Sequence, residues 1–174
     1  MVLIMEADMR TTMAGWALVA TVMFVSADRV AAQQAAAPSC PATVATEFAG
    51  WSKPASVAPG GVLPISPVGR LALKPSAGVS FEVTPAKTPP ADTFSGVVRF
   101  GVAKAGTYRV ALGGAAWIDV VQSRKVLTST AHAHGPVCSP VKKMVDFALP
   151  AGRYALQLSG AKTAELSVSI TAIR

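Results

Sequence analysis

The stretch AGTYRVALGG (residues 105–114) is repeated in altered form as AGRYALQLSG (residues 151–160). Each copy follows a run in which apolar residues occupy every second position, residues 98–102 before the first and 145–149 before the second. Glycine adopts the backbone conformations of tight turns that other residues avoid, so each Ala-Gly pair is typical of a turn between two strands. The repeat therefore predicts two equivalent β-hairpins, with the tyrosine and the aliphatic residues of each copy facing a core.

The sequence on either side of the repeat also indicates β-structure. Residues 79–84 and 166–170 alternate between apolar and polar side chains, which is the period of a strand with one buried face. Pro and Gly recur every 8 to 12 residues from Cys40 onward, and no long segment there has a helical period. The expected strands are 61–66, 70–74, 79–84, 96–102, 107–112, 116–122, 125–130, 142–149, 154–158 and 165–173. We therefore predict an all-β, antiparallel β-sandwich, jelly-roll-like, with eight to ten strands.

The N-terminal segment has the features of a secretory signal peptide over residues 1–32. Arg10 precedes an apolar run over residues 13–25, and small residues precede Gln33. Cleavage after Ala27 and retention of the run as a membrane anchor are the alternatives, although the run is shorter than the roughly 20 residues that span a bilayer. We expect a mature protein in the periplasm or secreted, with no integral membrane span after cleavage.

The two cysteines of the chain, Cys40 and Cys138, are expected to form one disulfide, because an oxidising compartment favours pairing. Residues 33–39 would be a flexible leader, and residues 40–174 a single sandwich domain. Acylation of Cys40 in a lipoprotein and two metal-binding thiols are the alternatives.

Positive charge is in excess in the predicted mature chain, residues 33–174, which has 14 Lys and Arg against 6 Asp and Glu, a balance of +8. Such an excess attracts polyanions such as acidic glycans. Nucleic acid is not expected as a partner, because the chain is predicted to be exported and has no recognisable nucleic-acid module. The candidate residues for surface binding are Trp51, in an expected loop, and the adjacent pair Arg124 and Lys125.

His132 and His134 are candidate metal ligands, because residues two apart in a strand point to the same face. Both rings would then reach one Cu, Zn or Fe ion, with a third ligand from another segment. The candidates for this ligand are Glu82, Asp119, Met144, Asp146 and Glu165. The alternative is a pair of surface histidines beside the disulfide.

The repeated motif resembles the AGxY hairpins of many extracellular jelly-roll and pre-peptidase-like sandwiches. Residues 105–121 and 129–147 are similar to a group of small exported proteobacterial proteins of undefined role, to some of which the name homogentisate 1,2-dioxygenase has been attached. That name implies a cupin-type iron site with two His and one Glu on a far longer chain. His132 and His134 would supply two such ligands, whereas the sequence GPVC (residues 135–138) stands where the Glu is expected.

Catalytic motifs are otherwise lacking in the sequence, which has no Gly-x-Ser-x-Gly nucleophile elbow and no phosphate-binding glycine motif. We expect an exported non-catalytic binding or structural module of the cell envelope without a cofactor, with an anionic envelope polysaccharide or another envelope protein as partner. The alternative is a small metal-binding protein or metalloenzyme that uses His132 and His134.

Overall fold

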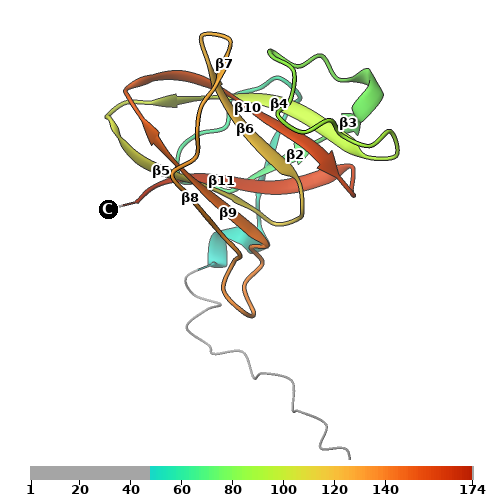
Figure 1. The fold of residues 1–174 in the computed structure, drawn as a ribbon. Helices are drawn as coiled ribbons and strands as arrows, with labels where there is room; N and C mark the ends of the chain where they lie inside the picture. The colour runs from blue at the N-terminus through green and yellow to red at the C-terminus, as the bar shows by residue number, and fades with distance from the viewer. Residues whose placement is uncertain (1–47, 174) are drawn as a thin grey trace, which may run out of the picture. The chain divides into compact units, whose positions relative to one another are not determined.

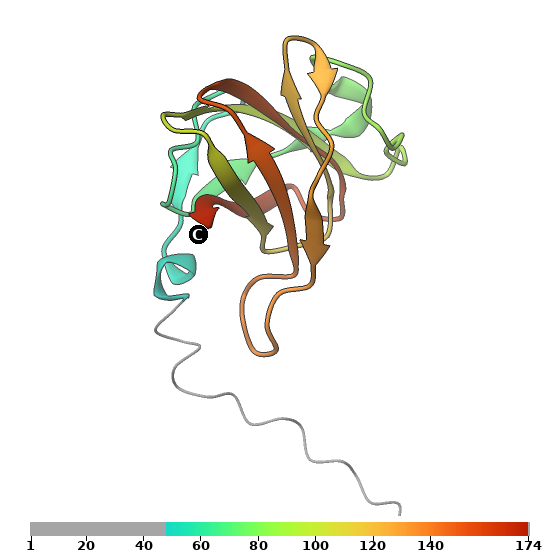
Figure 2. The ribbon, with the colours of Figure 1, turned by 60° about the vertical axis from the view of Figure 1, so that its left-hand side comes forward.

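The computed structural model describes residues 48–173, which form two β-sheets and two short 3₁₀ helices (Figures 1 and 2). The predicted signal peptide, the leader and Cys40 lie outside the described residues, so these predictions stay open. The helices are η1 (Ala49–Ser52) and η2 (Ser76–Gly78). Within the described residues, neither helix approaches the length needed to cross a membrane.

The larger sheet has six strands in the order β1-β2-β11-β5-β9-β8. In chain order its strands are β1 (Ala55–Val57), β2 (Gly69–Ala72), β5 (Gly106–Leu112), β8 (Ala131–Ala133), β9 (Lys143–Leu149) and β11 (Glu165–Ile173). The smaller sheet has five strands in the order β3-β4-β10-β6-β7. Its strands are β3 (Lys74–Pro75), β4 (Phe94–Val102), β6 (Trp117–Gln122), β7 (Lys125–Val126) and β10 (Gly152–Ala161). All pairs of these strands are antiparallel except β1 with β2.

The strand order is that of a jelly roll. Four strands, β2-β11-β5-β9, face a second set of four, β4-β10-β6-β7. The chain crosses between the sheets from β2 to β3, β4 to β5, β5 to β6, β7 to β8, β9 to β10 and β10 to β11. Two interleaved Greek keys give this arrangement. The predicted fold class is therefore confirmed, and the described residues contain 11 strands rather than eight to ten because short edge strands are added to the eight.

The core lies between the sheets and contains the alternating apolar residues of both copies of the repeat. Tyr108 and Tyr154 are 7% and 3% exposed, as expected for inward-facing positions. The Tyr108 hydroxyl donates to the Lys104 carbonyl at 2.8 Å, and the Tyr154 hydroxyl donates to the Pro150 carbonyl at 2.6 Å. Each tyrosine thus bonds its hydroxyl to the carbonyl four residues earlier, so the two copies are structurally equivalent. The prediction that each copy forms a β-hairpin was wrong, because β4 and β5, like β9 and β10, lie in different sheets and are joined by a turn that crosses between them.

The prediction of a strand at residues 79–84 was wrong, because this segment belongs to a loop over residues 79–92. The loop lies against the outer face of the smaller sheet. There its backbone bonds to the side chain of Gln157 of β10 and not to the backbone of a neighbouring strand. The Gln157 side-chain oxygen accepts the amides of Glu82 and Val83 at 2.7 and 3.1 Å, and its amide nitrogen donates to the Val83 carbonyl at 3.1 Å. The alternating pattern is thus satisfied by a loop packed on a sheet.

Two further predicted strands differ from the structure, and two edge strands were missed. Residues 61–66 contribute only an isolated bridge between Val62 and Arg99. The segment 125–130 is a strand only over Lys125–Val126, and the chain then passes to the other sheet as β8. The edge strands β1 and β8 were not predicted, because three residues are too few to show an alternating pattern.

Candidate functional site

An open groove of about 1050 Å³ lies where the 79–92 loop meets the ends of several strands. Its residues come from the loop, the connection between β5 and β6, the edge strand β8, the start of β9, and the end of β10. The groove is lined by Lys87, Thr88, Pro89, Pro90, Thr93, Ala115, Ala116, Trp117, His132, Ala133, His134, Lys142, Lys143, Ser159, Gly160 and Lys162. These residues include four lysines and no Asp or Glu, so the groove is electropositive.

Trp117, at the start of β6, lines the groove with 40% of its surface exposed. Its indole N–H donates to Oδ1 of Asp119 at 2.9 Å, while Oδ2 of Asp119 accepts the amide of Ala86 at 3.0 Å. Asp119 is 3% exposed and lies directly opposite Gln157 in the smaller sheet. One buried carboxylate therefore fixes both the indole ring and the part of the loop that carries Lys87.

Two ammonium groups lie close to the indole ring. Nζ of Lys143 is 5.0 Å from the Trp117 ring centroid, and Nζ of Lys87 is 5.9 Å from it. Lys143 is half-buried and also donates to the Ala116 carbonyl at 3.0 Å. Burial lowers the pKa of Lys143, the nearby charge of Lys87 lowers it further, and the carboxylate of Asp119 opposes both. The charge of Lys87 thus disfavours the charged form of Lys143, and an anion bound near both groups would relieve that repulsion.

Ser159 lines the same groove, and it is the cross-strand partner of Trp117. The residue is 2% exposed, and its hydroxyl is the buried side-chain polar atom that has no hydrogen-bond partner among the described residues. Buried polar groups are nearly always hydrogen-bonded in folded proteins. This hydroxyl is therefore a candidate to bind a ligand.

The predicted metal ligands His132 and His134 both line the groove, and both are exposed. The described residues contain no group of three or more His, Cys, Asp or Glu side chains that could hold a metal ion. Three of the expected third ligands have other partners: Asp119 binds Trp117, Asp146 binds Arg109, and Glu82 binds Arg99. A metal role for His132 and His134 stays a prediction. The charged residues that line the groove with them are lysines.

The residues predicted for surface binding lie outside the groove. Trp51 of η1 is half-buried, and its ring lies against Gly113 after β5, 3.5 Å from where a β-carbon on that glycine would stand. Arg124 and Lys125 are exposed at the turn from β6 to β7, where Ser123 and Arg124 have positive φ. Trp51 rather than Trp117 was selected from the sequence, which contains no spacing pattern that links Trp117 to Lys87.

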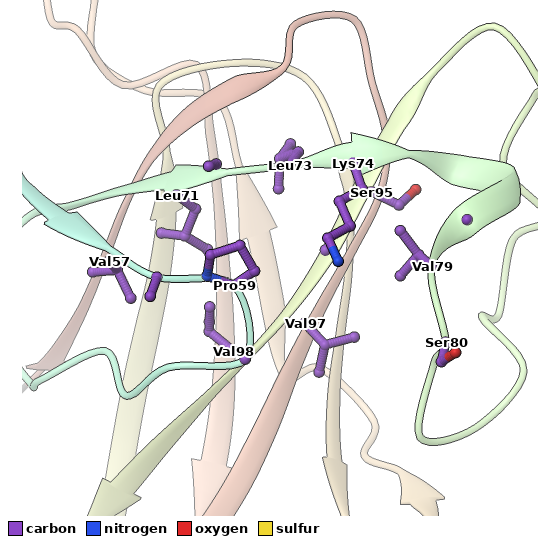
Figure 3. Close-up of a pocket in the computed structure, with 15 residues that line it drawn as sticks. Val57, Pro59, Leu71, Leu73, Lys74, Val79, Ser80, Ser95, Val97 and Val98 are labelled. Carbon is purple, nitrogen blue, oxygen red and sulfur yellow. The ribbon is translucent and has the colours of Figure 1, made fainter.

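A second cavity, of about 300 Å³, has no residue in common with the groove (Figure 3). It lies between the β1–β2 side of the larger sheet and β3–β4 of the smaller one. Apolar side chains predominate in its lining, with Lys74 and two serines among them; the labelled residues are Val57, Pro59, Leu71, Leu73, Lys74, Val79, Ser80, Ser95, Val97 and Val98. Leu71, Leu73 and Val98 also belong to the main core, whereas Pro59, Lys74 and Ser80 are exposed, so this cavity opens from the core to the surface on one side of the sandwich.

Cys138 lies in the segment that projects from the sheets between β8 and β9 (orange in Figures 1 and 2). Its predicted disulfide partner, Cys40, is outside the described residues, so the pairing stays a prediction. Comparison with protein-family models, with curated proteins and with solved structures gives no match for this chain.

Proposed function

We propose that this chain is an exported, non-catalytic binding module of the cell envelope, and that its groove binds an anionic glycan. The observation that carries the proposal is an exposed Trp117 flanked by Lys87 and Lys143 in a groove whose lining has no carboxylate. Aromatic faces and positive charges together suit a ligand that has both sugar rings and negative charge.

Export is part of the proposal and is supported by the signal-like sequence of residues 1–32. The protein would then act in the periplasm or outside the cell, with Cys40 and Cys138 joined. Mass spectrometry of the protein isolated from its native host tests this: we expect a chain that begins near Gln33 and lacks alkylatable thiols before reduction. Recovery of the intact leader, or of two thiols that react without reductant, would contradict it.

The binding function is tested with a charge-matched pair of double variants. Lys87→Gln with Lys143→Gln removes the two ammonium groups beside Trp117, and Lys53→Gln with Lys74→Gln removes the same charge outside the groove. We expect the groove variant to bind anionic oligosaccharides about tenfold more weakly in titration calorimetry, and the control to change by less than about twofold. Equal losses in the two variants would show that binding follows net charge rather than the groove. Failure of the unaltered protein to bind any anionic glycan more tightly than about 1 mM would end the proposal.

A further inference from the structure

Trp117 is held in place before any ligand binds. Its indole N–H is bonded to the buried carboxylate of Asp119, yet 40% of the residue stays exposed in the groove. A large aromatic side chain gains stability by burial, so an exposed and fixed ring is typical of a surface that binds a flat or ring-shaped partner. Fixing the ring in advance also lowers the entropy lost on binding.

The positive charges near the ring restrict where an anion can lie. Nζ of Lys143 and Nζ of Lys87 lie over the Trp117 ring, 5.0 and 5.9 Å from its centroid, so an anion that contacts both lies close to the indole. A carboxylate joined directly to a pyranose carbon keeps its charge at the edge of the sugar ring. A sulfate ester carries its charge further out, beyond an additional oxygen. The two lysines are therefore better placed for a ring that bears a carboxylate.

The unpaired hydroxyl of Ser159 provides an independent indication of a sugar. It lies in the groove, on the strand position opposite Trp117, and has no hydrogen-bond partner among the described residues. A hydroxyl group both donates and accepts hydrogen bonds, as the hydroxyl groups of a saccharide do, whereas a bare anion only accepts them.

We infer that the unit bound at Trp117 is a uronate, a pyranose ring that carries a carboxylate. The sugar ring packs against the exposed part of the indole, its carboxylate binds the ammonium groups of Lys87 and Lys143, and a ring hydroxyl pairs with Ser159. This inference rests on the proposed glycan-binding function and names the class of ligand within it.

The test compares three oligosaccharides of equal length with the full exported protein in titration calorimetry. They are an oligogalacturonate, its carboxyl-reduced neutral form, and a sulfated oligosaccharide with the same number of charges. We expect the oligogalacturonate to bind about tenfold more tightly than either of the others. Trp117→Ala should remove that preference, and Trp51→Ala, a change of the same kind outside the groove, should keep it. Because Trp117→Ala also removes a partner of Asp119, its folding is checked by circular dichroism.

Ser159→Ala provides a second variant that leaves the fold intact, because it removes a hydroxyl that has no partner. We expect its midpoint of thermal unfolding to be unchanged or higher, while its affinity for oligogalacturonate falls about threefold or more. Equal or tighter binding of the sulfated ligand, or equal losses for both acidic ligands in Trp117→Ala, would overturn the uronate assignment and leave the proposed function standing. Unchanged affinity in Ser159→Ala would overturn the placement of the sugar ring. Absence of binding to every acidic ligand would instead overturn the proposed function.

Discussion

Replacing Asp119 by asparagine tests whether one buried carboxylate organises the groove. Asp119 accepts two hydrogen bonds, from the indole N–H of Trp117 at 2.9 Å and from the amide of Ala86 at 3.0 Å. An asparagine side chain has nearly the same shape but only one acceptor oxygen. Its NH₂ group would face one of the two N–H donors, so Asp119→Asn loses one hydrogen bond and leaves a donor unpaired.

The expected loss of stability follows from the environment of that carboxylate. A hydrogen bond to a charged group contributes about 1.5–3 kcal/mol, and a neutral amide costs less to bury than a carboxylate, so we expect a loss of about 1.5–2 kcal/mol. For a domain of this size, that loss lowers the midpoint of thermal unfolding by about 5–10 °C. Affinity for an anionic ligand should fall as well, because Trp117 and the part of the loop that carries Lys87 are no longer held together.

Urea denaturation, followed by circular dichroism, measures the change in the free energy of unfolding. Asp92→Asn is the matched control, because it also removes one carboxylate, but from a side chain that is 78% exposed and 3.7 Å from Lys162. The control should change stability by less than about 0.5 kcal/mol. If Asp119→Asn were as stable as its control and bound ligand equally well, the assigned role of Asp119 would be refuted.

Three further predictions follow from side chains described above. Gln157→Ala removes three hydrogen bonds to the 79–92 loop, so amide exchange in the loop should accelerate and stability should fall by about 1–3 kcal/mol; unchanged protection of those amides would contradict the tether. Arg109→Ala leaves the carboxylate of Asp146, whose side chain is only 10% exposed, without the guanidinium that binds it through two hydrogen bonds of 2.8 Å. We expect urea denaturation to show a loss of about 1–3 kcal/mol, a range that allows for solvent screening because the Arg109 side chain is 35% exposed. Replacing Arg109 and Asp146 together by apolar residues should recover part of this loss. The pKa of Lys143 is lowered in the folded protein, so unfolding takes up protons in the pH range where this lysine titrates, and the free energy of unfolding should rise with pH up to the ordinary lysine pKa of 10.5. Lys143→Met should flatten that rise in urea melts between about pH 8 and pH 10.5. A pH profile unchanged by the substitution would exclude the effect.

Strands with long alternating patterns were predictable because one face of each lies in the core. The segments 96–102, 107–112, 142–149 and 165–173 correspond to β4, β5, β9 and β11 to within two residues at each end. β10 is buried without interruption from Tyr154 to Ser159, because the 79–92 loop covers its outer face, although its sequence there alternates Tyr154, Leu156 and Leu158 with small or polar residues. The 79–92 loop has the alternating sequence of a strand, but its backbone bonds to the side chain of Gln157. A periodic pattern does not show whether a segment pairs with a strand or with a side chain.

The groove was largely beyond sequence reasoning, because it depends on pairing between distant segments. Trp117 lies opposite Ser159 because of the register between β6 and β10. Lys87 lies near the Trp117 ring because Asp119 bonds to the amide of Ala86 in the 79–92 loop. The histidine pair that the sequence suggested as metal ligands lies in the groove, and its metal role stays a prediction. The choice of Trp51 over Trp117 reflects the fact that exposure of a single aromatic residue follows from packing and cannot be read from its neighbours in the chain.

The way in which the 79–92 loop is fastened has a consequence for how such a protein can diversify. At the base of the loop, the hydroxyl of Ser76 is within 3.0 Å of the hydroxyl of Thr93 and 2.7 Å of that of Ser95, and Gln157 and Asp119 hold its middle. Pro90 is bonded to one of these anchors, because its carbonyl accepts from the hydroxyl and the amide of Thr93, whereas none of the anchors bonds to the residues from Lys87 to Pro89 that border the groove. Those three residues can therefore be exchanged, by mutation or by design, for ones that suit another ligand, while the jelly roll beneath them keeps its packing.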